Sequence, residues 1–277
     1  ILAFDPSWAE TESSDDFAMQ VLKINESNKT SVLVHSYALP GSKLKDHINY
    51  FHYLLKSFNI VAIVGDYNGG VQFINSVNES QLFKEDKMQI NVMDVKFDDL
   101  TKYEESLREA RGQYNDGKTC YLRTPSSAWI RQANELLQRS FDHKKLWFSA
   151  RAINDSYQLQ RKKNIPITGL KYLPDTADTG TMNLDKGAKM IDFLEHQHDM
   201  INLTKSECAL IQIKTSPQGT QTFDLPDNLK RQTGPNKPRK DSYSALVLGN
   251  WMHQIYLDMM KVKEKPVHEG FTPMFLR

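Results

Sequence analysis

Short apolar runs open the chain, and their composition predicts β-strands. Residues 1–4, 17–22 and 31–35 are rich in aliphatic and aromatic side chains, which favour extended structure. The polar residues 25–29 separate the second run from the third, so these two runs are expected to form a hairpin. The pattern therefore predicts a sheet whose first three strands are antiparallel.

A helical pattern follows the hairpin. Apolar side chains recur every three or four positions from Leu44 to Phe58, which predicts an amphipathic helix with one buried face. The next run, 60–65, is unbroken in its apolar character and suits a central strand that is covered on both faces. Strands, helix and crossover strand in this order indicate an α/β protein with a mixed sheet and helices on both faces.

The middle of the chain is less regular and ends in a polar stretch. Residues 151–185 carry Pro and Gly among polar side chains, and we expect loops or an insertion there. Thr124 followed by Pro125 predicts a helix start, because Pro is favoured at the first helical position. The remaining expected elements are helices at 71–77, 107–111 and 124–139, and strands at 90–95 and 146–150.

Helical patterns return in the last third of the chain. We expect helices at 186–198 and near 203–210, and then a segment rich in Pro and Gly with a short hairpin about Thr222 and Phe223. The final helix has the clearest pattern, an apolar stripe at spacings of three and four that begins at Ala245. Stepping back four positions from Ala245 reaches Asp241, so this carboxylate is expected on the buried stripe at the helix N-terminus.

Composition limits the class of protein. Of the 277 residues, 39% are hydrophobic and 25% are charged, as in a globular protein with a sizeable core. No apolar run approaches the roughly 18 residues of a membrane span. The two cysteines, Cys120 and Cys208, are too few for a disulfide framework or a zinc site and favour a reducing compartment. The formal net charge is +1, so any affinity for nucleic acid has to come from local patches.

Three aspartates stand where chemistry is expected. Asp5 and Asp66 each end an apolar strand run, and Asp241 opens the final helix. Each has an ordinary alternative role, as a turn residue or a helix cap. Together they can converge at one point, where three like charges require cations, and oxygen ligands favour Mg²⁺ or Mn²⁺. Paired ions roughly 4 Å apart catalyse phosphodiester hydrolysis, so the pattern predicts a nuclease.

The order of these features resembles that of the ribonuclease H-like nucleases. Within that superfamily, the chain is most similar to the C-terminal nuclease domain of the large terminase subunit of tailed bacteriophages, over residues 1–80 and 200–262. The residues that carry the similarity are Phe4-Asp5-Pro6-Ser7, Ser14-Asp15-Asp16-Phe17-Ala18-Met19, Val64-Gly65-Asp66 and Arg239-Lys240-Asp241-Ser242-Tyr243-Ser244-Ala245-Leu246.

The resemblance implies a set of roles for these residues. Asp5 is expected to bridge two Mg²⁺ or Mn²⁺ ions, Asp66 to hold one ion and Asp241 the other. Asp16 or Asp15 is a candidate for a water-mediated metal contact, with a solvated charge at the hairpin edge as the ordinary alternative. The family cuts duplex DNA with little sequence preference during viral genome packaging in the host cytoplasm, together with a portal protein and a small terminase subunit.

The resemblance also guides the domain organisation. The interval between Asp66 and Asp241 is longer than the family pattern, so we expect an insertion within about 85–190 of a single domain, 1–262, followed by a C-terminal tail, 263–277. The chain starts inside a strand pattern, which suggests a segment of a longer polypeptide. In the family, an ATPase motor precedes the nuclease.

A basic segment leads directly into Asp241. It is rich in Gly and Pro and hence loop-like, and we expect it to contact DNA phosphates, with a solvated connector as the alternative. Arg161-Lys162-Lys163 is a second, weaker candidate. The candidate DNA-binding residues are Lys230, Arg231, Lys237, Arg239 and Lys240.

Two other functions fit the same residues. A Holliday-junction resolvase or a transposase-like nuclease shares the superfamily, but it needs a dimer surface or a junction preference that the sequence does not display. A nuclease-like module that no longer cuts, and docks a portal or capsid protein, is expected to lack a metal ligand. All three aspartates are present, which favours the endonuclease.

Overall fold

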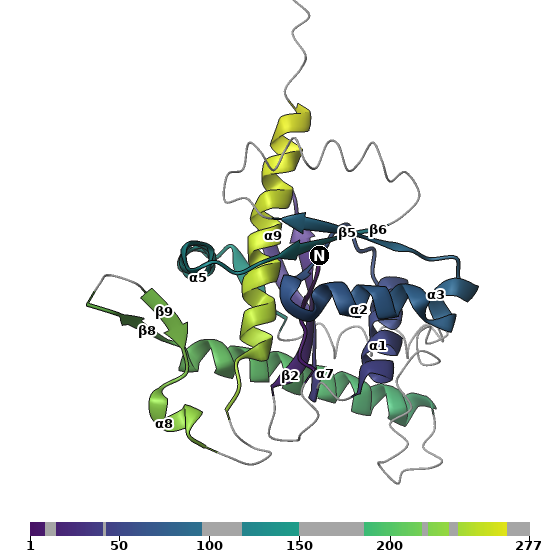
Figure 1. Cartoon of the computed structure of the whole chain (residues 1–277), viewed down its shortest axis with the longest axis horizontal. Helices are drawn as coiled ribbons and strands as arrows, with labels where there is room; N and C mark the ends of the chain where they lie inside the picture. Colours follow the sequence, from purple (N-terminus) through teal and green to yellow (C-terminus); the bar gives the residue numbers. More distant parts are fainter. Residues whose placement is uncertain are drawn as a thin grey trace, which may run out of the picture.

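The sheet is the centre of the molecule. The computed structural model describes residues 1–8, 15–40, 43–95, 118–149, 186–217, 221–232 and 238–264. Within these residues, seven strands form one mixed sheet in the order β5-β6-β4-β1-β2-β3-β7 (Figure 1). None of the helices in the described ranges combines the length and the apolar character of a membrane span.

The first strands form the antiparallel part of the sheet. β1 (Leu2–Asp5) lies between β2 (Asp16–Asn25), to which it is antiparallel, and β4 (Ile63–Asp66), to which it is parallel. β3 (Thr30–Pro40) pairs with β2 in antiparallel register. The hairpin predicted between the second and third runs is therefore confirmed, with turn residues at 26–29.

Parallel strands extend the sheet on both sides. β6 (Lys118–Arg123) pairs with β4, and β5 (Ile90–Val95) pairs with β6. At the other edge, β7 (Leu146–Phe148) pairs with β3. The predicted fold class is confirmed, because the chain is an α/β protein with a mixed sheet, antiparallel first strands and helices around it. This arrangement is consistent with a ribonuclease H-like fold.

One face of the sheet is packed with aromatic rings, and we call it the aromatic face. Phe4 of β1 lies 5.3 Å from Phe73, measured between ring centroids, and Phe17 of β2 lies 4.7 Å from the same ring. The three phenylalanines are fully buried. Aromatic burial and tilted ring contacts make this face a large source of stability. The helices that supply the rest of this core are α1 (Leu44–Ser57), α2 (Tyr67–Glu79) and α3 (Gln81–Glu85).

The opposite face is covered chiefly by α9 (Asp241–Glu264), the long yellow helix in Figure 1, and we call it the α9 face. α9 comes close to the sheet because Gly249 has no side chain. A Cβ at this position would lie 2.7 Å from Leu22 Cδ1 and 3.1 Å from Ala3 Cβ. Two further helices pack beside α9: α5 (Ser127–Asp142) and α7 (Lys186–Leu210).

Two helix predictions need correction. The predicted start of a helix at Thr124 is wrong, because the N-cap residue of α5 is Ser126, whose Oγ accepts a hydrogen bond from Trp129 N at 3.1 Å. Pro125 instead precedes the cap. The two helices predicted at 186–198 and 203–210 form the single helix α7, since residues 199–202 between them are helical as well and contain neither Pro nor Gly.

The predicted hairpin near Thr222 is present as a small second sheet. β8 (Gln212–Thr215) and β9 (Gln221–Asp224) are antiparallel, and the short helix α8 (Asp227–Lys230) follows them. Together they form the segment that leads toward α9. Figure 1 shows this hairpin at the end of the molecule where α9 begins.

The predicted insertion and tail are described only in part. Within the range 85–190, the strands β5, β6 and β7 and the helix α5 belong to the main sheet and its layers. Residues 96–117 and 150–185 lie outside the described residues, as do the helix predicted at 107–111 and the tail beyond Glu264. The insertion therefore stays a prediction.

Candidate metal centre

Two of the predicted aspartates lie at the same edge of the sheet. β1 and β4 are parallel neighbours, and Phe4 pairs with Gly65, so Asp5 and Asp66 follow side by side at the two strand ends. Side chains alternate along a strand, and Phe4 points to the aromatic face. Asp5 and Asp66 consequently belong to the α9 face. The register of the sheet, rather than any local feature, brings them together.

Asp241 reaches this edge from α9. It is the first residue of the helix and is buried. Its Oδ2 accepts a hydrogen bond from the backbone N–H of Asp16, at the start of β2, at 2.7 Å. Since β2 pairs with β1, this bond ties the helix start to the strand beside Asp5. The structure therefore brings the three predicted aspartates to one end of the sheet.

Burial raises the pKa of all three carboxyl groups, and the other two aspartates contribute to the rise for Asp5. The pKa of Asp5 is raised to about 8, chiefly by burial and also by the charges of Asp241 and Asp66, while a hydrogen bond from Ser244 and the charge of Lys240 act in the opposite direction. Burial also raises the pKa of Asp241 to about 7 and that of Asp66 above its ordinary value. At neutral pH the cluster holds protons that a cation would displace.

Asp66 also has the ordinary role that its position allows. Its Oδ1 accepts a hydrogen bond from Asn68 N at 2.7 Å and so caps α2. One oxygen of the Asp66 carboxylate therefore accepts a hydrogen bond from its own helix. Among the described residues, no backbone N–H group is bonded to the second oxygen. A cap and a metal ligand are compatible roles, because a carboxylate offers two oxygens.

Asp16 links Asp241 to the guanidinium group of Arg239. Its backbone donates to Asp241, and its carboxylate forms an ion pair with Arg239. Both partners of this ion pair are largely shielded from solvent, with 12% of each side chain exposed. The predicted water-mediated metal contact of Asp16 stays a prediction, and the described structure directs its carboxylate to Arg239.

A fifth acidic residue belongs to the same network, and the sequence did not reveal it. Glu207 of α7 is 3% exposed, and it accepts a hydrogen bond from Tyr243 N at 2.8 Å. The pKa of Glu207 is raised to about 8, chiefly by burial and also by the charges of Asp241 and Asp16, although the hydrogen bonds from the backbone of Tyr243 and Ser242 lower it. Its spacing of three residues from the buried Thr204 puts it on the inner side of α7.

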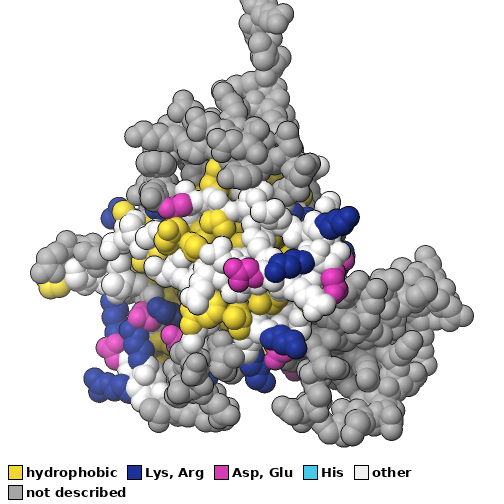
Figure 2. Space-filling view, turned by 45° about the vertical axis from the view of Figure 1, so that its right-hand side comes forward, with side chains coloured by type: hydrophobic (Ala, Val, Ile, Leu, Met, Phe, Trp, Pro, Cys, Tyr) yellow, Lys and Arg dark blue, Asp and Glu magenta, His cyan; other side chains and the backbone are white. Residues whose placement is uncertain are grey.

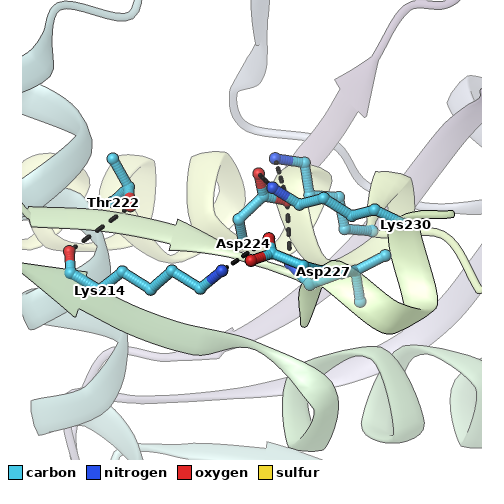
Figure 3. Close-up of polar contacts among 7 residues, drawn as sticks. Lys214, Thr222, Asp224, Asp227 and Lys230 are labelled. Carbon is cyan, nitrogen blue, oxygen red and sulfur yellow. Dashed lines mark hydrogen bonds and ion pairs between the residues drawn. The ribbon is translucent and has the colours of Figure 1, made fainter.

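The predicted DNA-binding residues are not one uniform basic surface. Lys230 forms an ion pair with Asp224 of β9 (Figure 3). Lys240 pairs with the same carboxylate at 3.1 Å. Arg239 pairs with Asp16 at the carboxylate cluster. Arg231 is exposed, and Lys237 lies outside the described residues.

Charges of both signs are interspersed around this hairpin. Lys214 of β8 pairs with Asp227 of α8 at 2.6 Å, close to the pair between Lys230 and Asp224 (Figure 3). On the face of the molecule in Figure 2, Lys and Arg side chains likewise lie among Asp and Glu. A DNA contact here has to exchange existing ion pairs for phosphate contacts.

The donor chemistry fits a hard divalent cation, and the present side-chain positions do not enclose one. The acidic residues supply oxygen ligands only, which Mg²⁺ and Mn²⁺ prefer. Among the residues that the structure describes, however, no three His, Cys, Asp or Glu side chains are grouped so that they could hold a metal ion. Asp66 and Asp241 instead accept hydrogen bonds from backbone N–H groups.

Comparison of the chain with protein-family models, with curated proteins and with solved structures finds no match. The function of this site has to be inferred from its own residues. The site holds three neighbouring carboxyl groups at the end of a mixed sheet, the carboxyl group of Glu207 behind them, and the ion pair between Asp16 and Arg239.

Proposed function

We propose that this chain is a metal-dependent endonuclease that cuts duplex DNA with little sequence specificity, as the nuclease part of a viral DNA-packaging terminase acting in the host cytoplasm. The observation that supports it is the convergence of Asp5, Asp66 and Asp241 from two strand ends and one helix start. Their mutual charge helps to raise the pKa of Asp5 to about 8, chiefly a consequence of burial. Ordinary turn or cap residues have no need of this convergence.

The residues at the proposed metal centre have different roles. Asp5 is influenced by both Asp66 and Asp241, so it is the candidate shared ligand between two ions. Two bound Mg²⁺ or Mn²⁺ ions would supply an activated water and charge stabilisation for phosphodiester hydrolysis. Arg239 neutralises Asp16, which keeps a further negative charge from opposing the approach of phosphate.

Substrate contact is assigned to the segment that leads into α9. Lys230 ends α8 and the exposed Arg231 follows it, while Lys240 directly precedes Asp241. Both lysines pair with Asp224 of the hairpin. Such cations hold phosphates without reading bases, which suits cutting with little sequence preference. The portal protein and the small terminase subunit are the partners implied by the same proposal.

Plasmid digestion tests the proposal. The wild-type chain should nick or linearise plasmid with Mg²⁺ or Mn²⁺ and should be inactive in EDTA. Asp5→Asn, Asp66→Asn and Asp241→Asn should each lower the cleavage rate by more than about 100-fold, since groups that only support a metal ligand already contribute about 10–100-fold.

Asp142→Asn is the matched control, because Asp142 is an exposed aspartate at the end of α5. It should cut like the wild type. If one of the three aspartate variants also cuts at the wild-type rate, that residue is not a ligand. Intact plasmid after incubation of the wild type with either metal would overturn the assignment as an enzyme.

One observation favours a second candidate, a module with this fold that docks a portal or capsid protein and does not cut. The described carboxylates do not enclose an ion. If this candidate is correct, millimolar Mn²⁺ will not raise the melting temperature of the chain, whereas preferential binding to the native state would raise it. Absence of both cleavage and thermal shift would favour the docking module.

A further inference from the structure

The first turn of α9 has an unusual cap. The first N–H groups of any helix have no partner within the helix and are commonly satisfied by the side chain of the N-cap residue. Ser244 N donates to the carbonyl oxygen of Lys240 at 2.8 Å, so Lys240 occupies the N-cap position. An ammonium group has no acceptor and cannot cap the helix. The N–H groups of Ser242 and Tyr243 must therefore find acceptors elsewhere.

Asp241 is the closest carboxylate in the sequence, and it is used differently. Its Oδ2 accepts the N–H of Asp16 on β2 at 2.7 Å. If Asp241 capped its own helix, its oxygens would turn toward the amides of the first turn instead. In the structure, this carboxylate is held against the strand that lies beside Asp5.

Glu207 of α7 supplies the missing acceptor. Its Oε2 accepts the N–H of Tyr243 at 2.8 Å, and the N–H of Ser242 donates to the same carboxyl group. The side chain is 3% exposed, so water cannot readily replace these bonds. A residue that is distant in sequence thus performs the capping that neither Lys240 nor Asp241 performs.

A second set of bonds holds the same turn from the other side. Gln20 Nε2, on β2, donates to the carbonyl oxygen of Ser242 at 2.8 Å and to Thr204 Oγ1 at 3.1 Å. Thr204 and Glu207 are three residues apart and share one side of α7. The start of α9 is therefore bonded directly to α7 and, through Gln20, to β2.

We propose that Glu207 is a positioning residue, which caps α9 from α7 and thereby leaves the carboxylate of Asp241 free to face Asp5 and the proposed ions. The capping geometry is given by the hydrogen bonds of Glu207 and Asp241. The effect on metal binding rests on the proposed function. Groups that orient metal ligands in this manner typically contribute about 10–100-fold to metal affinity.

Three variants separate positioning from general stability. Glu207→Ala removes the acceptor, and Glu207→Gln keeps one acceptor oxygen without the charge. Tyr243→Phe is the matched control, because it removes the bond from Tyr243 to Asn134 in the same helical turn but leaves the backbone N–H groups and Glu207 in place.

Two measurements follow the position of Asp241. The first is the apparent affinity for Mn²⁺, measured by calorimetry in the absence of DNA. The second is the NMR shift of the Asp16 amide proton in the metal-free protein, because this proton donates to Asp241 Oδ2. We expect Glu207→Ala to weaken Mn²⁺ binding about 10–100-fold and to move the Asp16 amide resonance. Glu207→Gln should restore part of both, and Tyr243→Phe should change neither.

The outcomes that overturn the inference are distinct from those that overturn the proposed function. If the wild type binds Mn²⁺ and Glu207→Ala binds it equally well, the positioning role is wrong while the metal centre stands. The positioning role is also wrong if Glu207→Ala and Tyr243→Phe lose affinity equally. If the wild type binds no Mn²⁺, the proposed function fails, and an unchanged Asp16 amide resonance in both Glu207 variants then rejects the positioning role as well.

Discussion

The two faces of the sheet differ in what they bury. The aromatic face buries rings such as Phe4, Phe17 and Phe73, which contact one another closely. The α9 face buries Asp241 and Glu207, whose pKa values are raised mainly by burial. Burying rings stabilises the fold, whereas burying carboxyl groups opposes it unless protons or cations compensate.

The contrast is sharpest between two consecutive residues of β1. Phe4 is fully buried on the aromatic face, and Asp5 follows it on the α9 face. Because side chains alternate along a strand, β1 contributes a ring to the aromatic core and a carboxyl group to the α9 face. We infer that the aromatic face supplies stability that lets the α9 face carry groups which cost stability.

The largest expected effect comes from substituting these two neighbours separately. Phe4→Ala should lower the free energy of unfolding by about 3–5 kcal/mol, as truncation of a buried aromatic side chain typically does. Asp5→Asn should leave it unchanged or raise it in the metal-free protein at pH 8, because it removes a charge from a crowded, buried site. Urea unfolding in EDTA measures both values.

The separation of the two faces fails if these variants destabilise the chain equally. Phe83→Leu provides a milder control on the aromatic face, since Phe83 is also fully buried and the substitution keeps most of the apolar volume. Its cost should fall below that of Phe4→Ala, in line with the smaller cavity that it leaves.

The second effect is a pH dependence of stability that arises on the α9 face. The pKa values of Asp5 and Glu207 are raised to about 8, and that of Asp241 to about 7, so the folded state binds protons more tightly than the unfolded chain. The resulting stabilisation is present at low pH, below the ordinary pKa values of Asp and Glu, and is lost as the pH rises through 7 to 8.

Melting temperatures in EDTA between pH 5 and pH 8 test this pH dependence. The contribution of these groups should fall as the pH rises, and Asp5→Asn should reduce the fall by about 3–4 kcal/mol over these three pH units, given about 1.4 kcal/mol for each unit of pKa. Millimolar Mn²⁺ should also reduce it, because the cation favours the deprotonated carboxylates. A slope that neither Asp5→Asn nor Mn²⁺ changes would assign the pH dependence to other groups.

The smallest expected effect is on DNA binding by the charged residues that precede α9. Lys230→Ala with Lys240→Ala should weaken DNA binding for all sequences and reduce the slope of affinity against salt by up to about two units. Asp224→Asn should act in the opposite direction, because it releases both lysines from their shared partner.

Fluorescence titration of duplex DNA at several salt concentrations measures these slopes. Lys84→Ala is a useful control, since Lys84 lies in α3 on the aromatic side of the sheet. Equal slopes for the wild type and the double lysine variant would identify the segment as a solvated connector. The DNA path would then have to include other cations, with Arg161-Lys162-Lys163 as the next candidate.

Sequence patterns predicted the elements whose information is local. The apolar runs that end at Asp5 and Asp66 are strands, and the stripe behind Asp241 is a helix, because each period is visible within one element. The start of α5 was misplaced because Pro125 offers a competing local start. The prediction also divided α7 in two, although residues 199–202 contain no Pro or Gly that would end a helix.

Contacts between residues that are distant in the sequence could not be predicted from sequence patterns. Glu207 caps a helix that begins 34 residues later in the chain, and no spacing rule links it to Ser242 or Tyr243. The lysines before Asp241 were interpreted as a basic surface because the position of Asp224 depends on how the hairpin folds back. The register that brings Asp5 beside Asp66 is likewise a property of the whole sheet.

The missing side chain at Gly249 has a consequence for sequence variation. This residue has no chemical role, and it lies two helical turns from Asp241, about 12 Å along the axis. A larger side chain would have to displace Leu22 or lift the middle of α9, and a stiff helix that is lifted at its middle also moves at its end. Substitutions at Gly249 that still permit folding would therefore be selected against, because they would change the distance between the carboxylates of Asp241 and Asp5. A mutational screen that scored expression alone would record the position as tolerant, and one that scored cleavage would record it as essential.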